Sequence, residues 1–236
     1  MLSVSIVIPV YHDTEALART LGVTDSSGAE VIVVSTPEDS TLAGLRLARP
    51  DIVWLEATRG RARQMNAGAA AARGDWLLFL HADSRLPRGW RDAIEDAHRS
   101  GSCVAGCYRF ALDSASAFAR LIELGVRLRV ALLRLPYGDQ ALFVRRERFE
   151  AVGGFSDLPI MEDVDFVRRI QKEGALFRSS LRVVTSARRW ERDGWVGRTL
   201  RHLLLISLYY CGVPPARLVR LDRARHPESS RQRMSL

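Results

Sequence analysis

The sequence predicts an α/β fold, with a mixed, mostly parallel sheet flanked by helices. Over residues 1–84, short apolar runs alternate with helical patterns in the order β-α-β-α-β-α-β, and the connections are short. The run from Trp76 to Leu80 has five consecutive apolar residues between turn signals, as expected for a central parallel strand buried on both faces. The chain of 236 residues is 47% hydrophobic, which is enough for one substantial core.

The first part of the chain is expected to contain four strands with helices between them. Pro9 ends the first strand because it lacks the backbone N–H that pairing requires, and Asp13 supplies the start of the first helix. An alanine-rich helix leads into the central apolar run. The strands are expected at residues 3–11, 30–34, 51–55 and 76–80, and the helices at 14–21, at 42–47 and ending at 73.

The second part of the chain is expected to be richer in helix. The segment 115–135 has apolar residues at helical spacing with arginines between them, a pattern typical of packing against the domain or of lying on a membrane surface. Pro214 and Pro215 break the last helix, and a polar tail begins at Pro227. Strands are expected at 102–112, 141–144 and 181–185, and helices at 86–100, 115–135, 145–152, 162–172 and 195–211.

Charge and cysteine content limit the partners and the compartment. The formal net charge of +8 favours anionic partners, namely nucleotide diphosphates, acidic lipid headgroups or nucleic acid. The acidic run at 162–165 and the lack of a recognisable nucleic-acid-binding module argue against nucleic acid. Three cysteines without a secretory signal predict the cytoplasm. No window reaches the roughly 18 apolar residues of a membrane span, so membrane contact would be peripheral, at the inner face.

Polar residues at the end of the central strand are candidates for a binding site. His81 and Asp83 stand at its carboxyl end, where open α/β sheets bind ligands. A carboxylate there suits a divalent cation on a diphosphate, and the alternative is that Asp83 only starts the turn or caps the next helix.

Two further clusters of charge occur at the starts of predicted helices. Arginines near Arg61 oppose the helix dipole, which is more readily accepted when an anion binds nearby, although solvation alone also explains them. The acidic pair Glu162 and Asp163 suits the dipole, so a pure capping role is the alternative to a catalytic one.

Taken in order, these segments resemble glycosyltransferase family 2, whose nucleotide-binding domain is called GT-A. The similarity extends from Ser5 to about Gly174. Its most specific part runs from Phe143-Val144-Arg145-Arg146 through Gly153-Gly154-Phe155 to Glu162-Asp163-Val164-Asp165, combined with Val7-Ile8-Pro9-Val10-Tyr11 and the strand ending in Asp83. Residues 60–69 and 80–84 are also similar to a small bacterial subfamily associated with arsenosugar biosynthesis and radical-enzyme gene neighbourhoods.

The resemblance implies a reaction and a domain plan. Residues 1–185 would form the GT-A domain, with a nucleotide-binding half at 1–84 and an acceptor half at 85–185, and residues 186–236 a helical appendage and tail. The implied enzyme is an inverting, metal-dependent transferase of hexosyl type. It moves a sugar from a nucleotide-diphosphate donor to the hydroxyl of a small-molecule or lipid-linked acceptor. Such a reaction needs a base, alignment of the substrates, and a cation, Mg²⁺ or Mn²⁺, to take up charge on the departing diphosphate.

The resemblance also assigns the chemical roles. The family's Asp-x-Asp motif falls on His81-Ala82-Asp83, so Asp83 is the expected metal contact. His81 could ligate Mn²⁺, touch the ribose, or be a buried neutral imidazole. Asp163 is the expected base, with Glu162 beside it, and a neighbouring carboxylate would raise the pKa of Asp163. Asp83 and Asp163 must therefore share one cleft.

Further positions match the family's substrate contacts. The expected acceptor residues are Asp139 and Gln140. The family places an aspartate at the end of the second strand, but this chain has Ser35 there, which puts selectivity for uracil in doubt; Asp39 is a substitute that would have to loop back. The expected donor-binding residues are Pro9, Tyr11, Ser35, Arg61, Asn66, His81, Asp83, Arg189 and Trp190. Trp190 has the alternative role of anchoring the C-terminal helix.

Two other functions compete with this prediction. The basic amphipathic segment 115–135 and the apolar segment 203–210 suggest transfer to a polyprenyl phosphate at the membrane surface. His81 and Ser35, which depart from the family pattern, suggest a nucleotide-sugar-binding protein that has lost catalysis.

Overall fold

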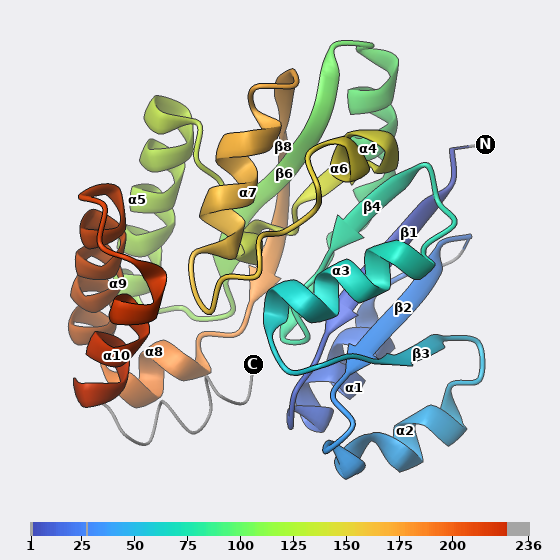
Figure 1. Cartoon of the computed structure of the whole chain (residues 1–236), viewed down its shortest axis with the longest axis horizontal. Helices are drawn as coiled ribbons and strands as arrows, with labels where there is room; N and C mark the ends of the chain where they lie inside the picture. Colours follow the sequence, from blue (N-terminus) through green and yellow to red (C-terminus); the bar gives the residue numbers. More distant parts are fainter. Residues whose placement is uncertain (1, 27, 226–236) are drawn as a thin grey trace.

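The computed structural model describes residues 2–26 and 28–225, so the polar tail expected from Pro227 lies outside the described residues. These residues form an eight-stranded sheet in the order β3-β2-β1-β4-β7-β6-β8-β5 (Figure 1). The strands are β1 (Val4–Pro9), β2 (Glu30–Ser35), β3 (Val53–Glu56), β4 (Trp76–Phe79), β5 (Ser84–Arg85), β6 (Cys103–Leu112), β7 (Phe143–Arg145) and β8 (Ala175–Thr185).

Helices cover both faces of this sheet and one of its ends (Figure 1). They are α1 (Thr14–Val23), α2 (Ala43–Ala48), α3 (Arg61–Ala71), α4 (Trp90–Arg99), α5 (Ala117–Leu133), α6 (Arg146–Ala151), α7 (Glu162–Ile170), α8 (Arg188–Asp193), α9 (Trp195–Tyr210) and α10 (Pro215–Arg225). Short 3₁₀ turns lie at Ser40–Leu42 and Gly138–Gln140.

The apolar run at 76–80 forms the central strand, as predicted. β4 pairs in parallel with β1, where Leu78 is opposite Ile6, and antiparallel with β7, where Leu78 is opposite Phe143. All four residues of β4 are buried. Because β1, β2, β3 and β4 are parallel and β7 opposes β4, the predicted mixed, mostly parallel sheet is confirmed. The carboxyl ends of the parallel strands meet at the edge where the chain continues to Asp83.

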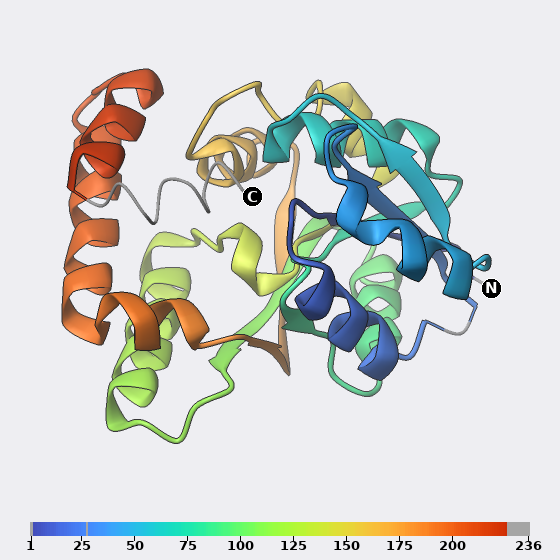
Figure 2. The ribbon, with the colours of Figure 1, turned by 90° about the horizontal axis from the view of Figure 1, so that it is seen from below.

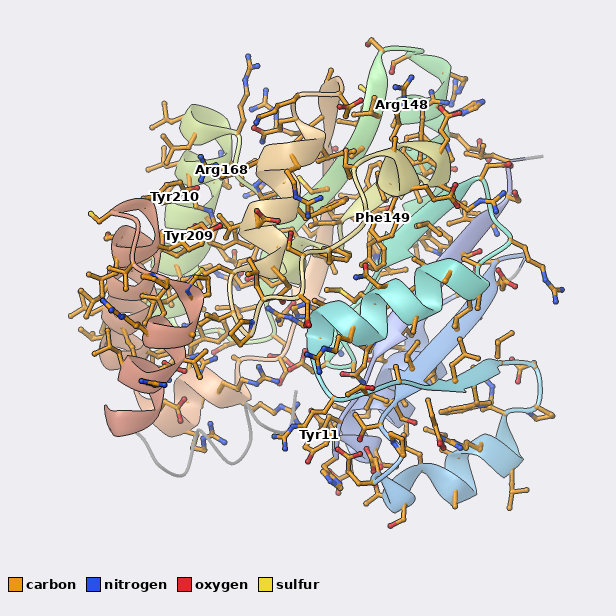
Figure 3. The ribbon with its side chains drawn as sticks, viewed as in Figure 1. Tyr11, Arg148, Phe149, Arg168, Tyr209 and Tyr210 are labelled. Atoms are coloured by element: carbon orange, nitrogen blue, oxygen red, sulfur yellow. The ribbon has the colours of Figure 1, made fainter. Side chains whose placement is uncertain are left out.

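Alternate residues of the strands supply two separate cores. Ile6 and Ile8 pack with α1 and α4 on one face, whereas Val7 packs with α3, α6 and α7 on the other. On that second face α3 lies very close to the sheet at Gly68, where an added Cβ would stand only 2.4 Å from the Val7 side chain. Phe149 joins an aromatic cluster there (Figure 3), 5.2 Å from Phe79 between ring centroids.

Four elements differ from the sequence prediction, and one of them is the two-residue strand β5, which was not predicted. β8 begins at Ala175 rather than at residue 181. The prediction missed its first half because all of those residues are exposed or half-buried. The helices α8 and α10 were not predicted. α9 ends at Tyr210, where Gly212 follows with φ 86° and allows the chain to turn. α10 begins at Pro215, since proline at the first position of a helix loses no intrahelical hydrogen bond.

The C-terminal helices lie beyond the β6–β8 end of the sheet, beside α5 (Figures 1 and 2). Leu205 of α9 and Leu218 of α10 are buried with Tyr137, Met161 and Val164, which ties these helices to α7 and the segment before it. The division of the chain at residue 185 stays a prediction. Among the described helices, none is both long enough and apolar enough to cross a membrane.

Candidate active site

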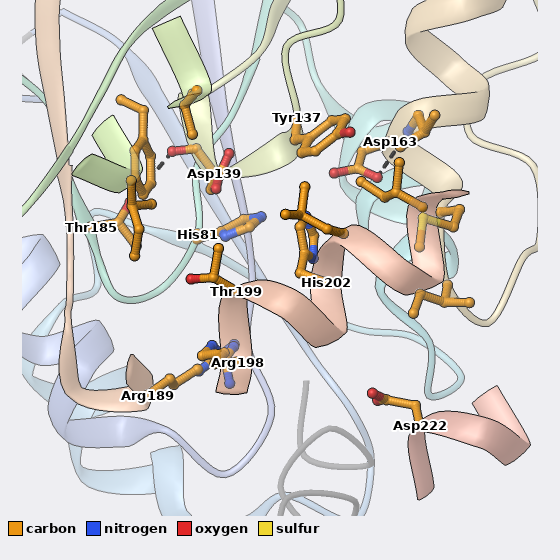
Figure 4. A pocket seen from close by; sticks show the side chains of 18 of the residues that line it. His81, Tyr137, Asp139, Asp163, Thr185, Arg189, Arg198, Thr199, His202 and Asp222 are labelled. Carbon is orange, nitrogen blue, oxygen red and sulfur yellow. Dashed lines mark hydrogen bonds between the residues drawn. The ribbon is translucent and has the colours of Figure 1, made fainter. Parts of the chain in front are cut away.

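A cavity of about 1320 Å³ lies where the carboxyl edge of the sheet faces α5, α7 and α9 (Figure 4). Most of the predicted site residues line it: Arg61, His81, Asp83, Asp139, Glu162, Asp163, Arg189 and Trp190. Four of them (Arg61, His81, Asp83 and Arg189) also line a smaller hollow that Pro9 and Asp13 complete. Asp83 and Asp163 therefore share one cavity, as the predicted reaction requires.

The carboxylate of Asp83 is held between two arginines. Its Oδ2 atom lies 3.3 Å from Nη2 of Arg188 and 3.6 Å from Nη2 of Arg189. Burial alone would raise the pKa of Asp83, but these guanidinium groups outweigh it and the pKa is lowered. Asp83 is therefore ionised at neutral pH, at a place that is already rich in positive charge.

Arg188 connects this site to the opposite end of the chain. Its guanidinium binds both carboxylate oxygens of Asp13, with 2.9 Å between Nη1 and Oδ1. The predicted start of α1 at Asp13 is correct in position, but the side chain makes no capping hydrogen bond to the helix. Neither Arg188 nor Asp13 was predicted to be a site residue. The one available signal was the position of Arg188 directly before Arg189.

Asp163 stands in the first turn of α7 and accepts two backbone hydrogen bonds. Its Oδ2 atom accepts from the N–H of Gly138 and its Oδ1 atom from the N–H of Val164, both at 2.8 Å. Burial would raise the pKa of Asp163, but Arg61 and the two N–H groups lower it. The expected net rise in the pKa of Asp163 does not occur; burial, with Asp163 nearby, raises the pKa of Glu162 instead.

Glu162 forms a buried ion pair with Arg61. The Nε atom of Arg61 donates to Oε1 of Glu162, whose side chain is only 2% exposed. Burial disfavours the charge on Arg61, but Glu162 and Asp163 outweigh it and raise the pKa of Arg61 further. Through this ion pair Glu162 holds Arg61 beside the cavity.

His81 and Asp139 place two unpartnered polar atoms beside Asp163. Nε2 of His81 and Oδ1 of Asp139 are buried and have no hydrogen-bond partner in the part of the chain that the structure describes. Burial, with Arg61 nearby, lowers the pKa of His81 to about 4, so the imidazole is neutral at pH 7. Burial raises the pKa of Asp139 to about 6.

A glycine allows these groups to converge. At Gly138, a Cβ atom would lie 3.1 Å from Nε2 of His81 and 3.4 Å from Oδ2 of Asp163. Figure 4 shows His81, Asp139 and Asp163 with Thr199 and His202 of α9 across the cavity. The polar end of the cavity therefore contains an ionised carboxylate, a neutral imidazole and a carboxyl group that titrates near neutral pH.

The residues predicted to read the nucleobase lie outside this cavity. Tyr11 is 9% exposed (Figure 3), and the guanidinium of Arg59 covers its ring at 4.6 Å from the centroid. The hydroxyl of Ser35 accepts a 2.7 Å hydrogen bond from Arg46. Asp39 does turn back toward the first strand, where its carboxylate accepts from the N–H of His12 at 2.6 Å.

Two other predicted residues are bound to the protein itself. The amide of Asn66 donates to the carbonyl and accepts from the N–H of Phe155, at 2.8 and 2.9 Å. The amide of Gln140 donates to the carbonyl of Tyr108 and accepts from Arg129, at 3.0 and 3.2 Å. The structure does not bring either side chain into the cavity.

Metal binding depends on a single protein carboxylate. Among the described residues, no group of three or more His, Cys, Asp or Glu side chains is arranged to hold a metal ion. Mg²⁺ is often held by one or two carboxylates together with substrate phosphate oxygens. Asp83 fits that requirement, because both arginines contact the same oxygen, Oδ2, which leaves Oδ1 as the atom to assign to a cation.

Comparison with known proteins identifies a family. Residues 5–151 match the family described as "Glycosyl transferase family 2". The chain is 24% identical over 182 residues to an uncharacterized glycosyltransferase of Haemophilus influenzae, covering 72% of this chain and 62% of the relative. It is 31% identical over 114 residues to the succinoglycan biosynthesis protein ExoO of Rhizobium meliloti, covering 43% of this chain and 32% of that protein. The chain thus spans less than two thirds of either relative.

A solved structure has the same fold. TarS of S. aureus, crystallised in complex with UDP-GlcNAc, superposes with a TM-score of 0.60 over 78% of this chain and 58% of the TarS chain. The sequence identity is 15%, so this similarity shows the fold alone.

Proposed function

The chain belongs to glycosyl transferase family 2 and is a glycosyltransferase, and from this premise we propose that it transfers a sugar, with inversion, from a nucleotide-diphosphate donor to an acceptor hydroxyl. One observation carries this proposal. A single cavity joins an ionised carboxylate at the start of α7 to a second carboxylate surrounded by arginines at the end of β4. The ionised carboxylate can accept a proton from an acceptor hydroxyl. The arginines around the second carboxylate can stabilise the negative charge of a departing diphosphate.

We assign the role of general base to Asp163. Its lowered pKa keeps it ionised at neutral pH, the state in which it can accept a proton. The acceptor oxygen attacks the anomeric carbon, the acceptor proton moves to Asp163, and the bond from the anomeric carbon to the diphosphate oxygen breaks with its electron pair. The two backbone hydrogen bonds fix the carboxylate in one orientation before the acceptor arrives.

The departing diphosphate is assigned to the arginine-rich end of the cavity. Arg61 and Arg189 line this end and are positioned by Glu162 and Asp83, so their charges are in place before the bond breaks. Asp83 would hold Mg²⁺ or Mn²⁺ through Oδ1, and the bound cation would add positive charge at the leaving group. Binding of the nucleobase at Pro9, Tyr11 and Ser35 stays a prediction, as does membership of the arsenosugar-associated subfamily.

The base assignment is tested by a matched pair of variants on α7. Asp163→Asn should bind the donor as the wild type does but lower the transfer rate at least a hundredfold, because the amide cannot accept the proton. The control is Asp165→Asn, whose carboxylate binds Ser156 and Arg169 instead of lining the cavity. Nucleotide release from a panel of nucleotide sugars measures transfer, and calorimetry measures donor binding.

Two results would contradict this assignment. Asp163→Asn transferring sugar at the wild-type rate would remove Asp163 from the role of base. A wild type that binds donors but releases no nucleotide with any acceptor would indicate a binding protein that has lost catalysis.

The metal assignment is tested at Asp83. With Mn²⁺ present, donor binding to the wild type should tighten about tenfold or more, and Asp83→Ala should remove most of that gain because it deletes the one assigned protein ligand. Asp96→Ala, at an exposed carboxylate on α4, is the control. If Mn²⁺ strengthens donor binding equally in all three proteins, the cation does not bind at Asp83.

We also propose that the enzyme acts in the cytoplasm, with peripheral contact to the membrane. The three cysteines are free thiols, which supports a reducing compartment. Exposed leucines of α5 and α9 lie among arginines, a combination that suits an anionic lipid surface.

A further inference from the structure

The cavity has a second, apolar part beyond its charged end. Side chains from two helices form this wall: Phe118, Leu121 and Ile122 of α5 and Leu200, Leu203 and Ile206 of α9. Several of them are substantially exposed to water, with Leu121 at 64% and Leu203 at 55%. Exposed apolar side chains that gather along one cavity mark a binding surface rather than a random surface feature.

The size and chemistry of the cavity indicate two occupants. At about 1320 Å³ it exceeds the range of roughly 300–1,000 Å³ that is usual for a single small-molecule pocket. A nucleotide-diphosphate donor needs the arginines of the charged end, and its polar groups would lose hydrogen bonds against the apolar wall. The occupant of the wall is therefore a second molecule with an apolar part.

We propose that the acceptor carries an apolar chain that lies between α5 and α9 and directs its hydroxyl group to Asp163. This inference rests on the proposed function. The base Asp163 and the apolar wall belong to the same cavity, so one acceptor molecule can contact both. Burying such a chain also removes the exposed leucines from water, which provides binding energy remote from the reacting hydroxyl.

The 1-alkanols from butanol to octanol are the simplest probes, because each is one hydroxyl group on an apolar chain. Their binding to the full chain is measured by calorimetry. Burial of each added methylene should tighten binding about two- to fourfold. Affinity that does not depend on chain length would overturn the proposal.

Matched variants locate the chain within the protein. Leu121→Gln and Leu203→Gln, which change the cavity wall, should weaken octanol binding about fivefold. Leu132→Gln and Leu204→Gln are the controls: they lie on the same two helices, are 76% and 45% exposed in the wild type, and do not line the cavity. All four positions are exposed, so folding is preserved, and circular dichroism verifies this.

Equal weakening by all four variants would overturn the proposal, because it would mean adsorption to the whole helix surface instead of binding in the cavity. Failure of the proposed function looks different. It would appear as absent donor binding or as full transfer by Asp163→Asn, whatever the alkanols do. Donor turnover with no preference for longer alkanols would defeat only the apolar-acceptor inference.

Discussion

At the scale of single residues, Asp139 carries an electrostatic cost within the site. Its Oδ1 atom is buried without a hydrogen-bond partner among the described residues, and burial raises its pKa to about 6. Between about pH 4 and pH 6 the folded protein therefore keeps a proton that the unfolded chain has already released. The contribution of Asp139 to the free energy of unfolding therefore falls as the pH rises through this window.

This cost can be measured by removing the titrating group. Asp139→Asn should increase the free energy of unfolding by about 1–3 kcal/mol at pH 7.5, and by much less at pH 4.5, where Asp139 of the wild type is protonated. Urea denaturation at the two pH values measures the difference. A gain of equal size at both would show that Asp139 titrates normally in the folded state.

Site residues could be predicted from the sequence where they stand at the end of a strand or at the start of a helix. Asp83 follows the central strand and Asp163 starts a helix, and both positions can be recognised along the sequence. Arg188 could not be predicted, because its partner Asp13 is 175 positions away. Asn66 and Gln140 were predicted to bind substrate, but their amides donate hydrogen bonds to backbone carbonyl groups. The sequence does not reveal these bonds.

At the scale of elements, α5 ends at a residue with unfavourable backbone geometry. Arg134 follows its last turn with φ 54° and ψ 32°, a left-handed conformation that glycine adopts without steric cost. Arg134→Gly should therefore raise the free energy of unfolding by about 1 kcal/mol. Urea denaturation measures the change.

The matched control for this change is Arg127→Gly in the middle of the same helix. It should lower the free energy of unfolding by about 1 kcal/mol, because glycine is a poor helix former there. The same sign of change at both positions would contradict the explanation, since the two glycines would then act only through lost arginine side chains.

Elements were predictable where the apolar pattern is strong. The buried run of β4 and the amphipathic pattern of α4 give clear periodicities, and both elements form. The first half of β8 lacks such a pattern, because its residues are exposed or half-buried. Pairing with β6 keeps this half in the sheet. Long-range pairing of this kind is decided by the partner strand, which local sequence does not show.

At the scale of the whole molecule, two strands of the sheet, β7 and the edge strand β5, run antiparallel to their neighbours. β7 lies antiparallel between β4 and β6, so the strands before and after it belong to one continuous sheet. Periodicity along the chain predicted alternating strands and helices over residues 1–84 but not this insertion. The resemblance to the family supplied the GT-A architecture, and the TarS superposition confirms that fold.

The bridge from Arg188 to Asp13 and Asp83 has a consequence for synthesis of the protein. Asp13 and Asp83 leave the ribosome early, and the arginine that they share leaves only after β8. A nascent chain can therefore pair β1 with β2 and β4 before Arg188 and Arg189 have been translated. Asp13 and Asp83 gain this shared partner only after translation has passed β8.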